Sequence, residues 1–163
     1  MLSRLWKYFS LYFLKPFDAV NDTLTASLLS RFNWSGNFVE IGAGDGVYSY
    51  IMHGGDFPFW FDRYLLTDLS QDDIYDTPSH NILPRGKPLA FPRIEKAIDA
   101  KQSHVAKIKE IGFAGEAICA PYENLPILSE SVEAVFYYTP HGLKDHEQAI
   151  SEAYRILRPG GRM

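Results

Sequence analysis

The chain has 163 residues, 46% of them hydrophobic, and its 16 Lys and Arg against 20 Asp and Glu give a net charge of −4. This length supports one domain with a single core, and the charge gives no support to nucleic-acid binding, which needs a basic surface. The lone cysteine, Cys119, excludes an internal disulfide and a cysteine-based metal cluster, so we expect a cytoplasmic protein.

The first 35 residues predict a helical lead-in. Residues 1–16 hold an apolar stretch that Lys7 and Ser10 interrupt, and it is too short to span a bilayer and lacks a signal-peptide cleavage pattern. Helical spacing places large apolar side chains on one face: Leu2, Leu5, Trp6, Phe9 and Phe13. This helix either docks on the domain or lies on a membrane surface. A second amphipathic helix is predicted over residues 16–32, with an apolar face of Phe17, Val20, Leu24 and Leu28.

A glycine-rich motif follows the first predicted strand. In GNFVEIGAGDG, residues 38–41 form a short buried strand, and Gly42, Gly44 and Gly46 make a turn that leads into a helix. Such a turn lets a ligand approach the main chain and points amides at an anionic group. A dinucleotide fingerprint would need its third glycine at position 47, where this chain has Val47. The spacing therefore disfavours a nicotinamide-dependent oxidoreductase.

The rest of the chain alternates predicted strands and helices. A second strand is predicted over residues 63–70, an irregular loop over 71–92 and an amphipathic helix over 93–112. Strands at 115–120 and 131–139 follow, and a last helix over 145–157 begins at Asp145 with a capping box. This alternation predicts a parallel sheet with helices on both faces.

Three segments resemble the motifs of class I S-adenosylmethionine-dependent methyltransferases, of the type 11 kind. They are VEIGAGDG, TDLSQDDI, and the long stretch that runs from YENLP to the final RPGG. The resemblance implies a Rossmann-like three-layer α/β sandwich with a mainly parallel sheet, incomplete at the C-terminus and preceded by the helical lead-in. The implied domains are the lead-in at 1–35 and an S-adenosylmethionine-binding domain at 36–163.

The same resemblance implies a set of cofactor-binding residues. The turn formed by Gly42, Ala43, Gly44 and Gly46 would cradle the methionine end of S-adenosylmethionine, with Glu40 near its amino group. Asp68 at the tip of the second predicted strand would hold the ribose, and Leu69 would line the adenine slot. The family's usual acid after the third strand aligns with Pro121, so Tyr122 is expected to cover the adenine ring or to offer its amide.

The catalytic machinery is less defined by the sequence. Methyl transfer depends mainly on positioning and desolvation, so no catalytic dyad is required. His141, after the fourth strand, is a candidate general base, although it could equally pack beside the last helix. The remaining histidines show no metal-ligand spacing, and no metal site is predicted.

The resemblance stops before the last three strands of the family's seven-stranded sheet. The expected strand order is 3-2-1-4, with the fourth strand as an uncovered edge open to a partner chain. We expect methyl transfer to an unidentified acceptor, with a small molecule favoured. The alternative is a truncated, non-catalytic cofactor-binding or interaction module whose open edge recruits a partner strand.

Overall fold

The computed structural model describes residues 2–31, 37–62, 94–138, 143 and 145–163, and for residues 2–5 it describes the backbone only. The chain divides into two compact units. The first comprises Met1–Asn33 and Val47–Ala90, and the second comprises Trp34–Gly46 and Phe91–Met163. Residues 1–33 of the predicted lead-in fall within the first unit, which also includes the helix after the glycine-rich turn.

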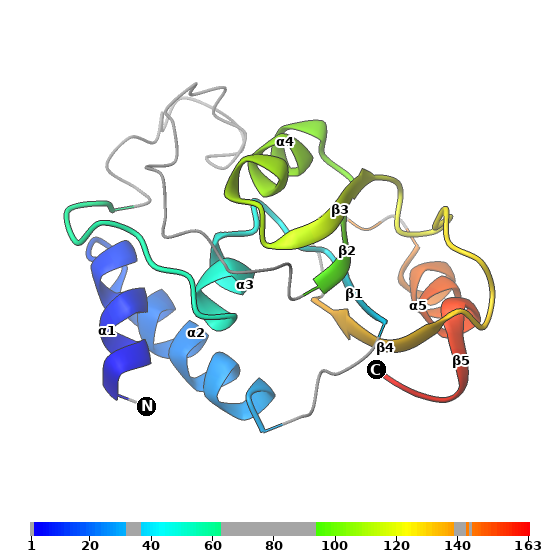
Figure 1. Cartoon of the computed structure of the whole chain (residues 1–163), viewed down its shortest axis with the longest axis horizontal. Helices are drawn as coiled ribbons and strands as arrows, with labels where there is room; N and C mark the ends of the chain where they lie inside the picture. The colour runs from blue at the N-terminus through cyan, green and yellow to red at the C-terminus, as the bar shows by residue number, and fades with distance from the viewer. Residues whose placement is uncertain (1, 32–36, 63–93, 139–142, 144) are drawn as a thin grey trace. The chain divides into compact units, whose positions relative to one another are not determined.

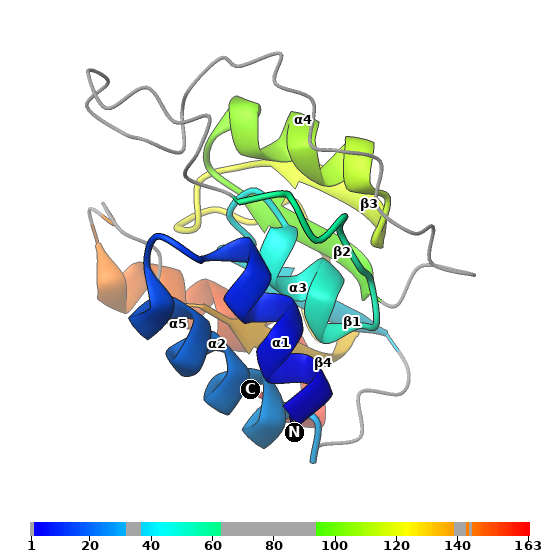
Figure 2. The ribbon, with the colours of Figure 1, turned by 90° about the vertical axis from the view of Figure 1, so that its left-hand side faces the viewer.

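The described residues of the first unit form the helices α1 (Leu2–Leu11), α2 (Pro16–Leu29) and α3 (Val47–Met52). Figures 1 and 2 show α1 and α2 side by side, and α2 packs through its small residues Ala19, Thr23 and Ala26. The hydroxyl of Tyr8 on α1 donates to the carbonyl oxygen of Tyr48 on α3 at 3.1 Å. The predicted apolar face of α2, formed by Phe17, Val20, Leu24 and Leu28, is exposed. The large apolar side chains of α2 thus lie outside the helix pair.

The second unit is built on a five-stranded sheet. Its strands are β1 (Phe38–Ile41), β2 (Ile94–Asp99), β3 (Ala114–Cys119), β4 (Val132–Tyr137) and β5 (Leu157–Arg162). They lie in the order β3-β2-β1-β4-β5, and every pair is parallel. The fold class is confirmed. The strand order has the predicted pattern 3-2-1-4, but its second strand is Ile94–Asp99, and the second strand predicted at residues 63–70 lies outside the described residues. Because the carboxyl ends of parallel strands meet at one edge, the turns after β1, β2 and β3 lie at the same edge of the sheet.

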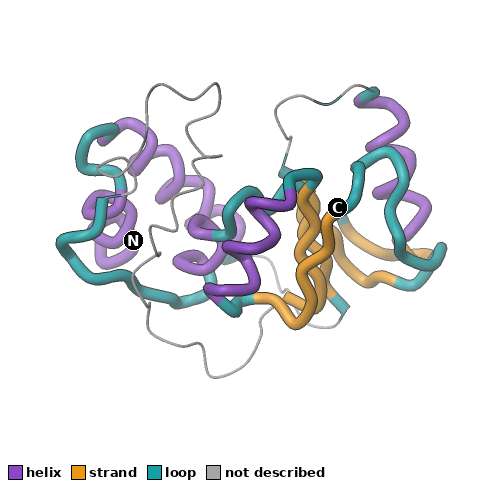
Figure 3. The backbone as a smooth tube through the Cα atoms, turned by 90° about the horizontal axis from the view of Figure 1, so that it is seen from above, coloured by secondary structure: helices purple, strands orange, loops and turns teal. Residues whose placement is uncertain are grey.

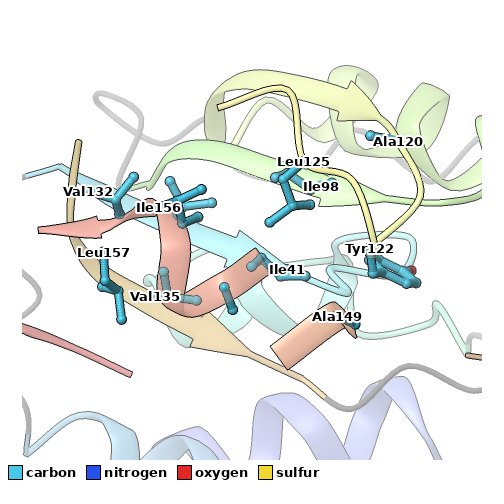
Figure 4. Close-up of a cluster of buried hydrophobic side chains, with 12 residues drawn as sticks. Ile41, Ile98, Ala120, Tyr122, Leu125, Val132, Val135, Ala149, Ile156 and Leu157 are labelled. Atoms are coloured by element: carbon cyan, nitrogen blue, oxygen red, sulfur yellow. The ribbon is translucent and has the colours of Figure 1, made fainter. Parts of the chain in front are cut away.

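Two helices cover opposite faces of this sheet, α4 (Gln102–Ile111) and α5 (His146–Ile156). Ile98 packs in the core cluster that includes Ala149, Ala153 and Ile156 of α5. The next residue, Asp99, points to the other face, where it contacts His104 of α4. Figure 3 shows the strands between these helices, which gives the three layers that the sequence predicts. The carboxylate of Asp145 accepts from the amide of Gln148 at 3.0 Å, so the N-cap prediction is confirmed. The reciprocal half of the predicted capping box is not formed, because the amide of Asp145 donates to Oε1 of Glu123 and the side chain of Gln148 donates to the carbonyl oxygen of Glu123.

Two predictions of local structure are wrong. Residues 93–112 were expected to form one helix, but they divide into β2 and α4. The apolar residues on the two sides of the break happen to fit helical spacing, whereas pairing of Ile94–Asp99 with both β1 and β3 favours the strand. β4 was expected to be an open edge, but β5 pairs with it at Val132 and Ala134.

Candidate functional site

The glycine-rich turn takes its shape from three residues with left-handed backbone angles. The φ values of Gly42, Gly44 and Gly46 are 79°, 58° and 80°, a region that L side chains rarely adopt. The amides of Gly42 and Ala43 donate to the carbonyl oxygen of Ile98 at 2.9 and 3.1 Å, which fastens the turn to the end of β2. The turn is therefore held by the sheet rather than by its own residues alone.

Gly44 and Gly46 serve different purposes in this turn. A Cβ added at Gly46 would lie 2.4 Å from the ring of Phe113, so the absence of a side chain there allows close packing. A Cβ added at Gly44 would meet nothing within 4 Å. Gly44 therefore borders open space, as expected of a position that a ligand can approach.

Asp99, at the carboxyl end of β2, is the charged centre of the site. It is 3% exposed, and its Oδ2 accepts from the amide of Gly44 at 2.9 Å. Its Oδ1 accepts from the amide of Lys101 at 2.9 Å and lies 3.0 Å from Nδ1 of His104. Burial alone would raise the pKa of Asp99, but these hydrogen bonds outweigh it and hold the pKa below its ordinary value. Asp99 is therefore ionised at neutral pH.

Tyr122 lies beside Asp99. Its side chain is buried, and its hydroxyl oxygen accepts from the amide of Ala100 at 3.2 Å. Burial raises the pKa of Tyr122, and the neighbouring charge and hydrogen-bonding oxygens of Asp99 raise it further. Tyr122 is therefore a neutral phenol at physiological pH, next to the turn after β2.

Glu40 occupies a buried position in β1, 2% exposed. It pairs with Ala97 of β2 and Phe136 of β4 in the sheet register. Because residues two apart on a strand face the same way, Glu40 and Asp99 point to the same face of the sheet. The glycine-rich turn, Glu40, Asp99 and Tyr122 thus belong to the sheet edge where β1, β2 and β3 end.

Three predicted site residues, Asp68, Leu69 and His141, lie outside the described residues. In the structure, the strand that pairs with β1 on this side is Ile94–Asp99, and it ends in Asp99. Sequence reasoning missed Asp99 and its neighbour His104. The available signal was an aspartate directly after two apolar residues, Ala97 and Ile98, and the more apolar segment before Asp68 offered a stronger one.

Neither a metal cluster nor a membrane-spanning helix is found in the described parts of the chain. No group of three or more His, Cys, Asp or Glu among the described residues could hold a metal ion. None of the described helices is long and apolar enough to cross a bilayer.

Comparison with known proteins supports the class that the fold indicates. Residues 90–163 match the family described as "Methyltransferase domain". No curated protein sequence matches the chain. Three solved structures share the fold: the cyclase SpnF, a putative methyltransferase from Bacillus halodurans, and geranyl diphosphate methyltransferase in complex with GPP and sinefungin.

Their similarity lies in the fold rather than in the sequence. For SpnF the TM-score is 0.53 at 18% identity, over 86% of this chain and 42% of that one. For the Bacillus protein the TM-score is 0.50 at 15% identity, over 85% of this chain and 47% of that one. For geranyl diphosphate methyltransferase the TM-score is 0.51 at 12% identity, over 88% of this chain and 42% of that one.

The parallel sheet, the glycine-rich turn and the strand-tip acid define a Rossmann-like nucleotide-binding fold. The match of residues 90–163 to the methyltransferase family accords with this fold. The family's cofactor is S-adenosylmethionine. The chain spans 58%, 47% and 57% of the lengths of three further solved structures that it matches.

Proposed function

We propose that the edge formed by the turns after β1, β2 and β3 binds S-adenosylmethionine, and that the whole protein transfers its methyl group to a small-molecule acceptor. The observation that carries this proposal is the hydrogen bond from Gly44 to Asp99, which ties the glycine-rich turn to an ionised acid. Open space beside Gly44 and an acceptor carboxylate fit a ligand that carries ribose hydroxyl groups.

Each residue of the site has a proposed role. The turn from Gly42 to Gly46 receives the methionine end of the cofactor, with Glu40 near its amino group. Asp99 takes the role of ribose acceptor that the sequence suggested for Asp68, because Asp99 ends the strand beside β1. Leu69 stays a prediction for the adenine slot.

Adenine recognition departs from the family pattern. Pro121 offers neither a carboxylate nor an amide N–H, whereas Tyr122 presents a buried neutral ring beside the turn after β2. We propose that Tyr122 borders the adenine ring and that contacts with the ring, rather than a side-chain acid, define this part of the site.

The chemistry needs little from the protein beyond positioning. S-adenosylmethionine supplies an activated methyl group, and the protein orients it toward the acceptor and excludes water. His141 stays the candidate base for an acceptor that must lose a proton. The fold alone does not define the reaction, since SpnF is a cyclase.

A partner surface is also proposed for α1 and α2. Trp6, Phe13, Phe17 and Leu24 are exposed and apolar, and interfacial helices use such residues to enter the headgroup region of a membrane. We propose peripheral membrane contact through these two helices in the cytoplasm. The alternative interaction module relied on an open β4 edge, and the pairing of β5 with β4 removes that support at Val132 and Ala134.

Binding of S-adenosylhomocysteine, the product form of the cofactor, tests the proposal by isothermal titration calorimetry. We expect micromolar affinity, about −8 kcal/mol. Gly44→Ala should abolish binding because its Cβ enters the open space, whereas Gly54→Ala is the matched control. Gly54 also has a positive φ and open surroundings, but it lies outside the site. Equal affinity for both variants would reject the role of the glycine-rich turn.

A further inference from the structure

The acceptor positions of Asp99 are largely occupied by this chain. A carboxylate offers about four lone-pair sites, two on each oxygen. Oδ1 receives the amide of Lys101 and the ring nitrogen of His104, and Oδ2 receives the amide of Gly44. These three donors take three of the four positions, and the fourth, on Oδ2, is the one left for the hydroxyl of Tyr122.

His104 is the side-chain donor of these three. It lies in the first turn of α4 and is 9% exposed. An ionised carboxylate only accepts hydrogen bonds, so Nδ1 of His104 carries the proton that it shares with Oδ1. The other two donors are main-chain amides that no substitution removes without proline, so His104 is the contact that a side-chain change can release.

Tyr122 is the side-chain neighbour of the remaining position. Its hydroxyl is close enough for Asp99 to raise the pKa of Tyr122, while its oxygen accepts from the amide of Ala100. A phenolic proton rotates, whereas the amides of Gly44 and Lys101 are fixed by the backbone. Because Oδ1 already has two donors, we infer that Tyr122 faces Oδ2, where a ligand hydroxyl can replace it without breaking the other three contacts.

We propose that Asp99 accepts one ribose hydroxyl, through Oδ2, and that His104 is the positioning residue that keeps Oδ1 closed to the second hydroxyl. This inference rests on the proposed cofactor site and adds a specificity to it. A carboxylate with both oxygens open would take both hydroxyls at once. In this chain the donor on α4 occupies the oxygen that the second hydroxyl would need.

The test compares S-adenosylhomocysteine with its 2′-deoxy and 3′-deoxy analogues by calorimetry. For the unmodified chain, one analogue should bind about tenfold more weakly and the other about as well as the parent, because one charge-assisted hydrogen bond is lost in only one of them. His104→Leu should make both analogues weaker than the parent, since it opens Oδ1. His104→Asn keeps a donor near the position of Nδ1 and should retain the one-sided pattern.

The pattern distinguishes positioning from a general structural role. If His104 only stabilised the fold, His104→Leu would weaken all three ligands by the same factor, which would overturn the inference. Equal losses for both analogues in the unmodified chain would also overturn it, because Asp99 would then accept both hydroxyls. Failure of the unmodified chain to bind S-adenosylhomocysteine would overturn the proposed cofactor site and this inference with it. Circular dichroism establishes that each variant is folded.

Discussion

Replacement of Arg155 by methionine should destabilise the second unit by removing a set of side-chain hydrogen bonds. From α5, the guanidinium group donates to the carbonyl oxygens of Leu125 and Ile127 at 3.0 and 2.9 Å and to Oγ of Ser129 at 3.1 Å. It also pairs with both oxygens of Glu152, at 2.6 and 2.8 Å. The amide of Leu125 donates to the same carboxylate at 2.8 Å. Arg155 thus fastens the segment after Tyr122 to α5.

The expected loss follows from these contacts. Two main-chain carbonyl groups lose a charged donor, at about 1.5 kcal/mol each, and a partly exposed ion pair adds at most about 1 kcal/mol. The side chain of Arg155 is 34% exposed, so water replaces part of what is lost. We therefore expect the free energy of unfolding to fall by about 2–3 kcal/mol. For a chain of this size, that corresponds to a drop in melting temperature of about 4–12 °C.

Thermal and urea unfolding, followed by circular dichroism, measure this effect. Arg158→Met is the matched control, because Arg158 makes an exposed ion pair with Glu133 and should cost less than about 1 kcal/mol. Equal melting temperatures for the two variants would refute the reasoning, since the partly buried carbonyl contacts of Arg155 would then contribute nothing.

Three further predictions concern packing, pH and the exposed helix face. Gly46→Ala should lower the free energy of unfolding, measured with urea, by about 2–4 kcal/mol, because its Cβ collides with Phe113 and its φ is positive. A smaller loss of stability than in Gly54→Ala would contradict this. The lowered pKa of Asp99 means that its contribution to stability is complete above the unfolded pKa and is lost as pH falls through the folded pKa. The melting temperatures of the unmodified chain and Asp99→Asn should therefore differ at pH 7 and converge below about pH 4, and a constant gap would exclude the ionised carboxylate as the cause. Phe17→Ser with Leu24→Ser should reduce flotation of the whole chain with phosphatidylserine-containing vesicles, whereas Leu128→Ser, at another exposed site, should not; equal flotation would reject α2 as the contact.

The sequence predicts the centre of the fold because its signals there are local. The run from Phe38 to Gly46 combines a buried strand with glycines that the turn requires, and both features are found. The helix that starts after Asp145 is likewise predicted by its own cap. Elements whose structure depends on residues near in the sequence can therefore be predicted from sequence patterns.

The acid of the site could not be predicted in the same way. Residues 63–68 and 94–99 both end in an aspartate, but Glu95 and Lys96 interrupt the apolar residues of the second segment. Its strand is identified by pairing with β1 and β3, which the sequence does not reveal. The contact between Asp99 and His104 depends on how α4 returns over the sheet, which spacing alone does not reveal. The pairing of β5 with β4 is a similar case, because residues 157–162 read as a helix end and turn.

The most direct test of the account is calorimetric titration of S-adenosylhomocysteine into the unmodified chain, Asp99→Asn and Asp68→Asn. If Asp99 holds the ribose as proposed, Asp99→Asn removes the charge of that contact and its affinity should fall about tenfold or more, while Asp68→Asn should bind like the unmodified chain. Loss of binding in Asp68→Asn with full binding in Asp99→Asn would contradict the account and return the ribose contact to Asp68.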